Sequence, residues 1–170
     1  MSLSGLLVVV KTSTMPRYWL MKSEPGVFSI DDLSRAKDGT TRWDGVRNFQ
    51  ARNFLRSDIA VGDGVLFYHS SADPPAVAGT ARVVRAGYPD PSQFDPRDAH
   101  FDRDSSRDDP RWYAVDIQFE TKFAREVTLP ELRDARPLAE MMLLRRGSRL
   151  SVQPVTAGEW KQIVKMGSRA

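Results

Sequence analysis

Alternation of apolar and polar positions is clearest over Trp112–Thr128, where Tyr113, Val115 and Ile117 share one side of an extended chain. A period of two predicts a half-buried β-strand with a polar outer face. Short apolar or β-branched runs bounded by turn residues predict further strands over Tyr18–Lys22, Val65–Ser70, Ala76–Ala86 and Arg149–Val155. The middle of the chain is therefore expected to be rich in strands.

Helices are predicted where a capping residue precedes an apolar pattern of period 3.6. Ser29 is expected to cap a helix over Ile30–Ala36, with acidic residues in its first turn. Thr156 is expected to cap the closing helix, with Glu159 at the capping-box position. Another helix is predicted over Asn48–Asp58, with a polar stripe that faces solvent or phosphate. Shorter helices are expected over Pro130–Ala135 and Pro137–Arg146.

The segment Tyr88–Pro110 is rich in proline and aspartate and predicts a long loop. In a compact domain such a loop usually has a function of its own or covers a site. With strands in the middle and helices around them, the pattern favours an α+β fold built on an antiparallel or mixed barrel over a doubly wound sheet.

One domain accounts for the length of 170 residues, and a hydrophobic fraction of 41% is typical of a globular protein. The absence of cysteine excludes disulfides and thiolate metal sites. The longest apolar run, Leu6–Val10, is far shorter than the ~20 residues that cross a membrane. Because Met15-Pro16-Arg17 looks like a second start, residues 1–15 are interpreted as an N-terminal extension and residues 16–168 as the domain. We expect a cytoplasmic monomer, associated with the nucleoid if the source is bacterial, with no membrane partner and no cofactor.

The net charge of +3 is unevenly distributed along the chain. The segment Arg42–Arg56 holds four arginines against one aspartate, and Lys122–Arg149 holds seven basic residues against four acids. Between them, Tyr88–Pro110 holds seven aspartates against three arginines. An electrostatically polarised face that binds nucleic acid would have this distribution. Solvated helix surfaces and a solvated loop would account for it equally well.

The segment that begins at Trp43 combines residue types suited to a flat, polar ligand. Trp43 offers a stacking face, Asp44 and Asn48 offer hydrogen bonds to base edges, and the arginines offer charge for phosphate. Gly45 permits a tight turn between them. The segment therefore predicts a nucleobase pocket, although a buried tryptophan that anchors a loop to a helix would give the same pattern.

Motifs for catalysis are weaker. His69 and Ser70 are neighbours on a predicted strand, so their side chains point to opposite faces and cannot form a base–nucleophile pair. A metal site would need His100 together with several loop aspartates, and a solvated loop is the favoured interpretation. The remaining enzymatic candidate is Lys22, because a lysine whose pKa is lowered by burial can act as a nucleophile or base.

Several longer motifs resemble the EVE domain family, in the order and spacing found there. These motifs are Tyr18–Pro25, Trp43–Asn48 with Ala51–Asn53, Gly62-Asp63, Phe67–Ser70, Tyr88–Asp90, Pro110–Trp112 and Arg149–Pro154. The resemblance covers about residues 17–164. It implies a PUA-like fold, a strongly bent mixed β-barrel with peripheral helices, and a pocket for one nucleobase. EVE domains are regarded as readers of modified bases, chiefly modified cytosines in DNA.

The resemblance also implies roles for particular residues. Trp43 and Tyr68 are expected at the stacking surface, whereas Trp19 is expected in the core. Asp44 and Asn48 are expected to read base edges. The same pocket is expected to receive Lys22, Ser23, Ser70, Ser151 and Gln153, and phosphate contacts are expected from Arg47, Arg52 and Arg149.

Two alternatives stay open. Relatives of the same fold act on RNA, so a reader of modified RNA is the first. Some ASCH-like relatives are hydrolases of modified nucleosides with a catalytic lysine near the first strand, which Lys22 would supply.

Overall fold

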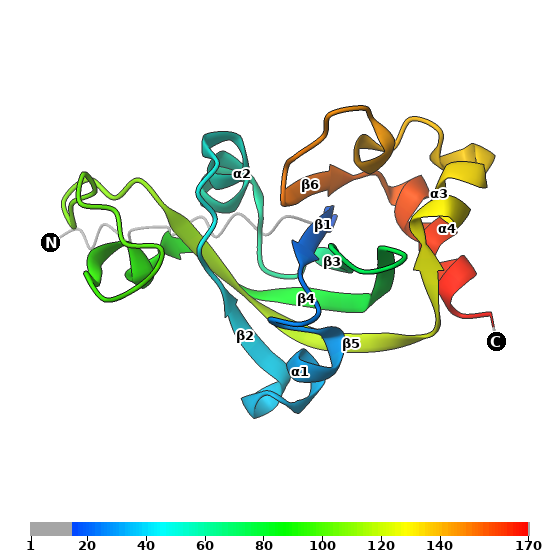
Figure 1. Ribbon diagram of the computed structural model, residues 1–170, viewed down its shortest axis with the longest axis horizontal. Coiled ribbons are helices and arrows are strands. Elements are labelled where there is room, and N and C mark those ends of the chain that lie inside the picture. The colour runs from blue at the N-terminus through cyan, green and yellow to red at the C-terminus, as the bar shows by residue number, and fades with distance from the viewer. Residues whose placement is uncertain (1–14, 170) are drawn as a thin grey trace, which may run out of the picture.

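The computed structural model describes residues 15–169 and contains a six-stranded mixed sheet of order β2-β5-β4-β3-β1-β6 (Figure 1). The strands are β1 (Tyr18–Ser23), β2 (Thr40–Trp43), β3 (Gly64–His69), β4 (Ala76–Pro89), β5 (Tyr113–Thr128) and β6 (Val152–Val155). Within residues 15–169 the β1–β3 pair alone is parallel, and the other neighbouring strands are antiparallel. The expectation about residues 1–14 lies outside the described residues.

The sheet is strongly bent, but among residues 15–169 it does not close into a barrel. Repeated register shifts along β4 and β5 produce the bend, since each shift increases the local twist. Gly79 lies at one of these shifts, where a Cβ atom would come within 2.2 Å of the Thr121 carbonyl. The edge strands β2 and β6 have four residues each and pair only with their inner neighbours. The α+β class and the strongly bent mixed sheet expected from the sequence are confirmed, and the sheet is open between β2 and β6.

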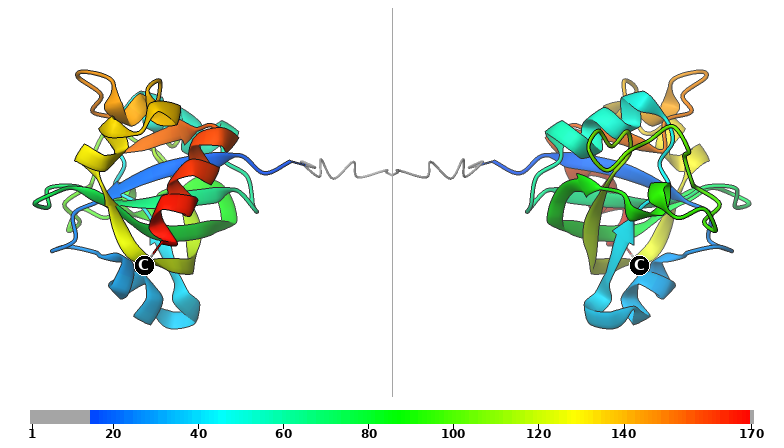
Figure 2. Two further views of the ribbon diagram at one scale, coloured as in Figure 1. Left: turned by 90° about the vertical axis from the view of Figure 1, so that its right-hand side faces the viewer. Right: turned by 90° about the vertical axis from the view of Figure 1, so that its left-hand side faces the viewer.

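The helices cover the sheet on its two faces and its ends. They are α1 (Ile30–Arg35), α2 (Phe49–Asn53), which continues as a π-helical turn over Phe54–Asp58, α3 (Leu129–Asp134) and α4 (Ala157–Gly167). The acidic loop that follows β4 and the helix α4 lie at opposite ends of the long axis (Figures 1 and 2). In the described part of the chain, no helix is long and apolar enough to cross a membrane.

The predicted caps are confirmed. The Ser29 hydroxyl accepts the Asp32 amide, and the Thr156 hydroxyl accepts the Glu159 amide at 3.1 Å in a reciprocal capping box. Asn48 precedes α2 as its N-cap, with its side-chain oxygen 3.0 Å from the Ala51 amide. The helix predicted over residues 137–146 is wrong: this segment forms two short 3-10 turns, Arg136–Leu138 and Met142–Leu144. Strand β2 was not predicted, because its four residues do not alternate.

The core consists of two apolar clusters, one on each face of the sheet. One face carries Trp19, Met21, Trp43, Phe67 and Val115. The opposite face carries Leu20, Leu66, Tyr68, Val127 and Ile163. Because successive side chains of a strand point to opposite faces, β3 separates Phe67 from Tyr68 although both are buried. This alternation decides which of the expected site residues can meet.

Candidate nucleic-acid interface

A cavity of about 340 Å³ lies beside Trp43. Its walls come from the end of β1, the turn before α1, the end of β2 and one loop residue: Ser23, Val27, Phe28, Thr41, Arg42, Trp43, Asp44 and His100. This set defines the Trp43 cavity. Its volume is at the lower end of the ~300–1,000 Å³ found for small-ligand pockets.

The indole of Trp43 is fixed by its neighbours and leaves only a small part open. The pairing of Trp43 with Val115 holds the backbone, and the Phe67 ring meets the indole edge-on at 5.6 Å between centroids. Trp43 keeps 9% of its surface exposed, at the cavity. The indole is thus both a core side chain and a wall of the cavity. The two interpretations of Trp43, as a buried anchor and as a surface for a ligand, are therefore compatible.

Polar groups stand at the rim of the cavity. The Asp44 carboxylate pairs with Arg42 at 3.2 Å, and both side chains are more than one third exposed. Such a surface pair contributes ~1 kcal/mol or less, so a ligand can displace one partner at little cost. The Ser23 hydroxyl donates to the Phe28 carbonyl at 2.5 Å and fixes the turn that carries Val27 and Phe28.

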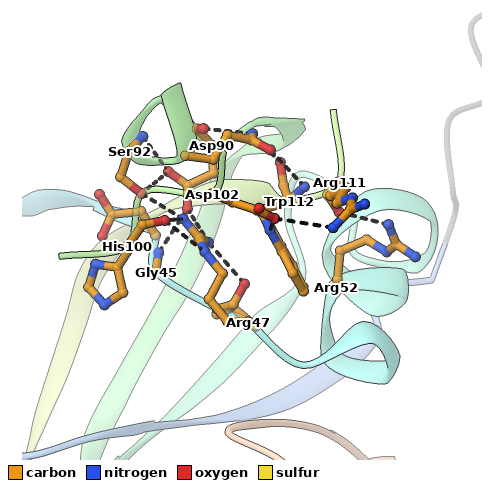
Figure 3. Close-up of polar contacts among 12 residues, drawn as sticks. Gly45, Arg47, Arg52, Asp90, Ser92, His100, Asp102, Arg111 and Trp112 are labelled. Carbon is orange, nitrogen blue, oxygen red and sulfur yellow. Dashed lines mark hydrogen bonds and ion pairs between the residues drawn. The ribbon is translucent and has the colours of Figure 1, made fainter. Parts of the chain in front are cut away.

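Arg47, expected from the sequence to contact phosphate, anchors the loop that follows β4. Its guanidinium donates to Asp90 Oδ2 at 2.9 Å, to Ser92 Oγ at 3.0 Å and twice to the His100 carbonyl, at 2.7 and 3.1 Å (Figure 3). A fourth acceptor is the Val46 carbonyl. With its donors used inside the protein, this side chain has little left to offer a phosphate.

Asp90 is the buried centre of this network, with no exposed surface. Besides Arg47, it accepts the Gly45 amide at 2.8 Å and both the amide and hydroxyl of Ser92. Burial alone would raise the pKa of Asp90. The hydrogen bonds outweigh that effect and hold the pKa of this carboxyl below its ordinary value.

The rest of the loop is tied to itself and to β5. The Gln93 amide donates to the carbonyls of Asp90 and Trp112, and the Trp112 indole donates to Asp102 at 2.7 Å. The segment predicted as a long loop is therefore an ordered unit, with one 3-10 turn over Pro91–Phe94. Across residues 15–169, no group of three histidine, aspartate or glutamate side chains is placed to hold a metal ion.

Three residues expected in the pocket lie on the opposite face of the sheet. Tyr68 packs in the second apolar cluster, and Lys22 is its neighbour in the β1–β3 register. Gln153 pairs with Leu20 of the same cluster; its side chain is buried and donates to Ser148 Oγ and the Leu150 carbonyl. Strand alternation therefore keeps these side chains out of the Trp43 cavity.

Partial burial lowers the pKa of Lys22. No ion pair within the described chain involves this lysine.

Ser70 and Ser151 lie beside the end of β1. Ser70 donates its amide to the Ser23 carbonyl, and the Lys22 amide donates to the Ser151 carbonyl, both at 2.9 Å. The Arg52 guanidinium donates to the Arg111 carbonyl at 2.7 Å and covers the Phe49 ring, so it is only partly free for phosphate.

A basic segment lies next to this end of the sheet. Arg145, Arg146 and Arg149 line a shallow cavity of about 310 Å³ together with Gln50 of the α2 region. Within residues 15–169 none of these three arginines forms an ion pair. Arg149 was expected here; its two neighbours were visible in the sequence only as part of a charge count.

Other residues of the Trp43 cavity were missed as well. Thr41 and Arg42 belong to the unpredicted strand β2, and His100 was considered only as a metal ligand. The signal available in the sequence was an apolar residue, Val27, directly after the turn residues Pro25-Gly26.

A larger cavity of about 540 Å³ lies elsewhere, between β4, β5 and α4, beside Phe123 and Trp160. Three of its polar side chains are paired with one another, since Glu120 accepts from Thr80 and pairs with Arg82.

The fold and the cavity define an α+β domain of the PUA-like type with an aromatic-walled pocket at the end of its first two strands. The chain belongs to the EVE domain family, which matches residues 17–166.

Three comparisons, two of them with the same human protein, illustrate the likeness. Human thymocyte nuclear protein 1 is 42% identical over 166 residues, which cover 88% of this chain and 73% of that protein. The structure of human THYN1 in complex with DNA containing 5-methylcytosine aligns with a TM-score of 0.84 at 40% identity, over 91% of this chain and 99% of that one. A Pseudomonas syringae protein of known structure is 47% identical, with a TM-score of 0.82 over 88% and 98%.

A more distant likeness is to the YTH domain of Zygosaccharomyces rouxii MRB1, with a TM-score of 0.53 and 15% identity over 92% of this chain and 87% of that domain. At that identity the likeness concerns the fold alone.

Proposed function

We propose that this protein is a non-catalytic nucleic-acid-binding module that holds one modified base, a modified cytosine in DNA, in the Trp43 cavity. The observation that carries the proposal is this aromatic-walled cavity in a chain 40% identical to human THYN1, a protein whose structure contains 5-methylcytosine DNA. The choice of a modified cytosine rests on the DNA in that complex, and the choice of pocket rests on the cavity in this chain.

The chemistry of the Trp43 cavity suits an extruded base. A base must leave its stack to be read, and an aromatic surface offsets part of the lost stacking. Trp43 and Phe28 supply apolar wall, while the weakly held Arg42–Asp44 pair supplies both a donor and an acceptor for the polar edge. A single added methyl group in such a pocket is worth roughly 1–3 kcal/mol, enough for preference without exclusivity.

The charges beside the cavity favour one direction for the nucleic-acid backbone. The Ser151 carbonyl accepts a hydrogen bond from Lys22 near the end of β1, so the basic segment Arg145–Arg149 lies near the strand end that carries Ser23. On another side the cavity meets the acidic loop at residue 100, and this loop carries seven aspartates against three arginines. The basic segment attracts phosphates and the acidic loop repels them. The nucleic-acid strand should therefore run from the pocket over the arginines.

The test is a binding titration of the purified protein at a fixed salt concentration near ~0.1 M, where electrostatic contributions remain visible. The probes are matched short DNA strands and duplexes with one central cytosine, 5-methylcytosine or 5-hydroxymethylcytosine, and the same sequence as RNA.

We expect a several-fold preference for one modified DNA, which Trp43→Ala removes because the cavity loses its main wall. Uniform weak binding to every probe would refute the proposal. A preference confined to modified RNA would replace DNA by RNA as the partner and keep the pocket. A Lys22→Ala variant that binds as the wild type does excludes a role for Lys22 in base recognition.

A further inference from the structure

His100 is the only residue of the Trp43 cavity that comes from outside the segment of residues 23–44. It belongs to the acidic loop between β4 and β5. Figure 3 shows its imidazole beside Gly45, projecting from the loop away from the Arg47 network. The cavity thus has one wall that is contributed by a separate part of the fold.

The backbone at His100 is held at both of its polar atoms. The carbonyl accepts two hydrogen bonds from Arg47, at 2.7 and 3.1 Å, and the amide donates to Asp98 Oδ1 at 2.8 Å. Arg47 is itself paired with the buried Asp90. A loop residue with this many restraints has little freedom to move away from the cavity.

The ring of His100 is also positioned, by Gly45. A Cβ atom at residue 45 would lie 2.8 Å from both Cε1 and Nε2 of the ring, so the imidazole occupies the space that any side chain there would need. Gly45 has φ +74°, a conformation that glycine adopts without strain. The other ring nitrogen, Nδ1, lies 3.3 Å from Asp98 Oδ1.

One face of the imidazole ring packs over Gly45, and Nδ1 lies beside Asp98. The His100 side chain is still 49% exposed, so part of the ring surface is free for contact at the cavity. A ring that is half exposed contributes little to the core, so the restraints on its position have no evident use in folding. They are explained if the exposed part contacts a ligand.

Resting on the proposed function, we infer that His100 forms the second aromatic wall of the base pocket and determines its specificity for a substituted base. The flat base lies in the cavity with Trp43 on one wall and the imidazole on another. Contact is through the ring surface rather than through a hydrogen bond. A small alkyl group on the base adds contact area only if both walls are present.

The experiment measures dissociation constants for a short DNA strand with one central 5-methylcytosine and for the same strand with cytosine. The variants are His100→Ala, His100→Phe and His100→Asn, with Trp43→Ala as the reference for a lost pocket. Phe101→Ala is the matched control, because Phe101 is the adjacent aromatic residue of the same loop, 40% exposed and outside the cavity lining.

We expect His100→Ala to weaken binding of the methylated strand about five- to tenfold, at the lower end of what one base–aromatic contact provides. The ratio between the two strands should fall toward one. His100→Phe should stay within about twofold of the wild type, because it keeps the ring surface, whereas His100→Asn should resemble His100→Ala. Phe101→Ala should bind as the wild type does, and thermal unfolding should show all loop variants folded.

Two results would overturn the inference while leaving the proposed function intact. In the first, His100→Ala keeps the full preference for the 5-methylcytosine strand while Trp43→Ala has lost it. In the second, His100→Asn keeps this preference and His100→Phe loses it, which would mean that residue 100 contacts the base by a hydrogen bond and not by an aromatic surface. If the wild-type protein does not discriminate the two strands, the proposed function itself fails.

Gly45→Ala provides a further check once thermal unfolding shows the variant folded, since alanine at φ +74° adds backbone strain and its methyl group would push the imidazole out. It should reduce discrimination as His100→Ala does, and the double variant should lose no more than either single one. Unchanged discrimination in Gly45→Ala would count against the inference.

Discussion

The assignment of Arg47 as the anchor of the acidic loop can be tested by Arg47→Ala. The variant removes the partner of a carboxylate that has no exposed surface and strands that charge in the protein interior. Breaking a buried ion pair on one side typically costs 3–5 kcal/mol. Asp90 keeps three other hydrogen bonds, from Gly45 and Ser92, so we expect the lower end, about 3 kcal/mol.

The measurement is urea unfolding, supported by thermal unfolding, in which a domain of this size should lose about 6–12 °C. Arg97→Ala is the matched control from the same loop, because its side chain is 90% exposed and its pair with Asp95 lies at the surface. We expect that control to change stability by no more than about 0.5 kcal/mol.

A double variant separates the stability lost through the unpaired charge from the stability lost with the hydrogen bonds. Asp90→Asn removes the charge, so Arg47→Ala combined with Asp90→Asn should be less unstable than the sum of the two single changes. The reasoning would be refuted if Arg47→Ala unfolded within about 2 °C of the wild type while its DNA affinity and salt dependence both decreased. That pattern would mean that Arg47 contacts phosphate after all.

Three further outcomes are expected. Arg149→Ala should weaken binding to all DNA strands about equally and reduce the slope of log K against log salt by about 1, whereas Arg103→Ala in the acidic loop should leave the slope unchanged. Stability should decrease as the pH falls below about 6.5, because burial lowers the pKa of His69 and its neutral Nε2 accepts the Ile30 amide at 3.1 Å. His69→Gln should flatten that dependence in urea unfolding at pH 7 and 5.5, and an unchanged slope would contradict it. Asp63→Ala should cost about 3 kcal/mol or more in the same assay, since this buried carboxylate accepts the Trp19 indole and two backbone amides.

The sign of the pH effect follows from which state binds the proton. The unfolded chain protonates its histidine near the ordinary pKa, while the folded chain resists protonation, so protons favour unfolding between the two values. The stabilisation is complete above the ordinary pKa and is lost as the pH falls through the lowered one. Glu126 and Asp31 act in the opposite direction and Lys122 in the same direction, but burial is the largest cause.

Much of the fold could be predicted because local patterns determine it. The caps at Ser29 and Thr156 and the alternation along β5 depend on residues within a few positions of one another. Strand β2 could not be found this way, since Thr40–Trp43 is a strand only through its partner β5. The open sheet likewise results from register shifts between distant residues, which no local pattern records.

The site was predicted less completely than the fold, for the same physical reason. Trp43, Asp44 and Ser23 were expected in the pocket and line one cavity. Tyr68 stands next to Phe67 in the sequence, but neighbours on a strand face opposite ways, and only the assembled sheet shows which way is toward Trp43. An arginine in a basic segment suggests phosphate until its acceptors are known, and those of Arg47 come from a distant loop.

The walls of the Trp43 cavity differ in how strongly they are tied to the core, and this difference affects specificity. The walls from β1 and β2 are part of the core, because Trp43 packs on Phe67 and cannot change without a cost in stability. The wall at His100 is half exposed and is attached through backbone atoms, by Arg47 and Asp98, whatever its side chain. A change at position 100 therefore alters the ligand-facing surface while the loop keeps its anchor. If the base is read here, position 100 is where the preference among modified bases can change without loss of the fold.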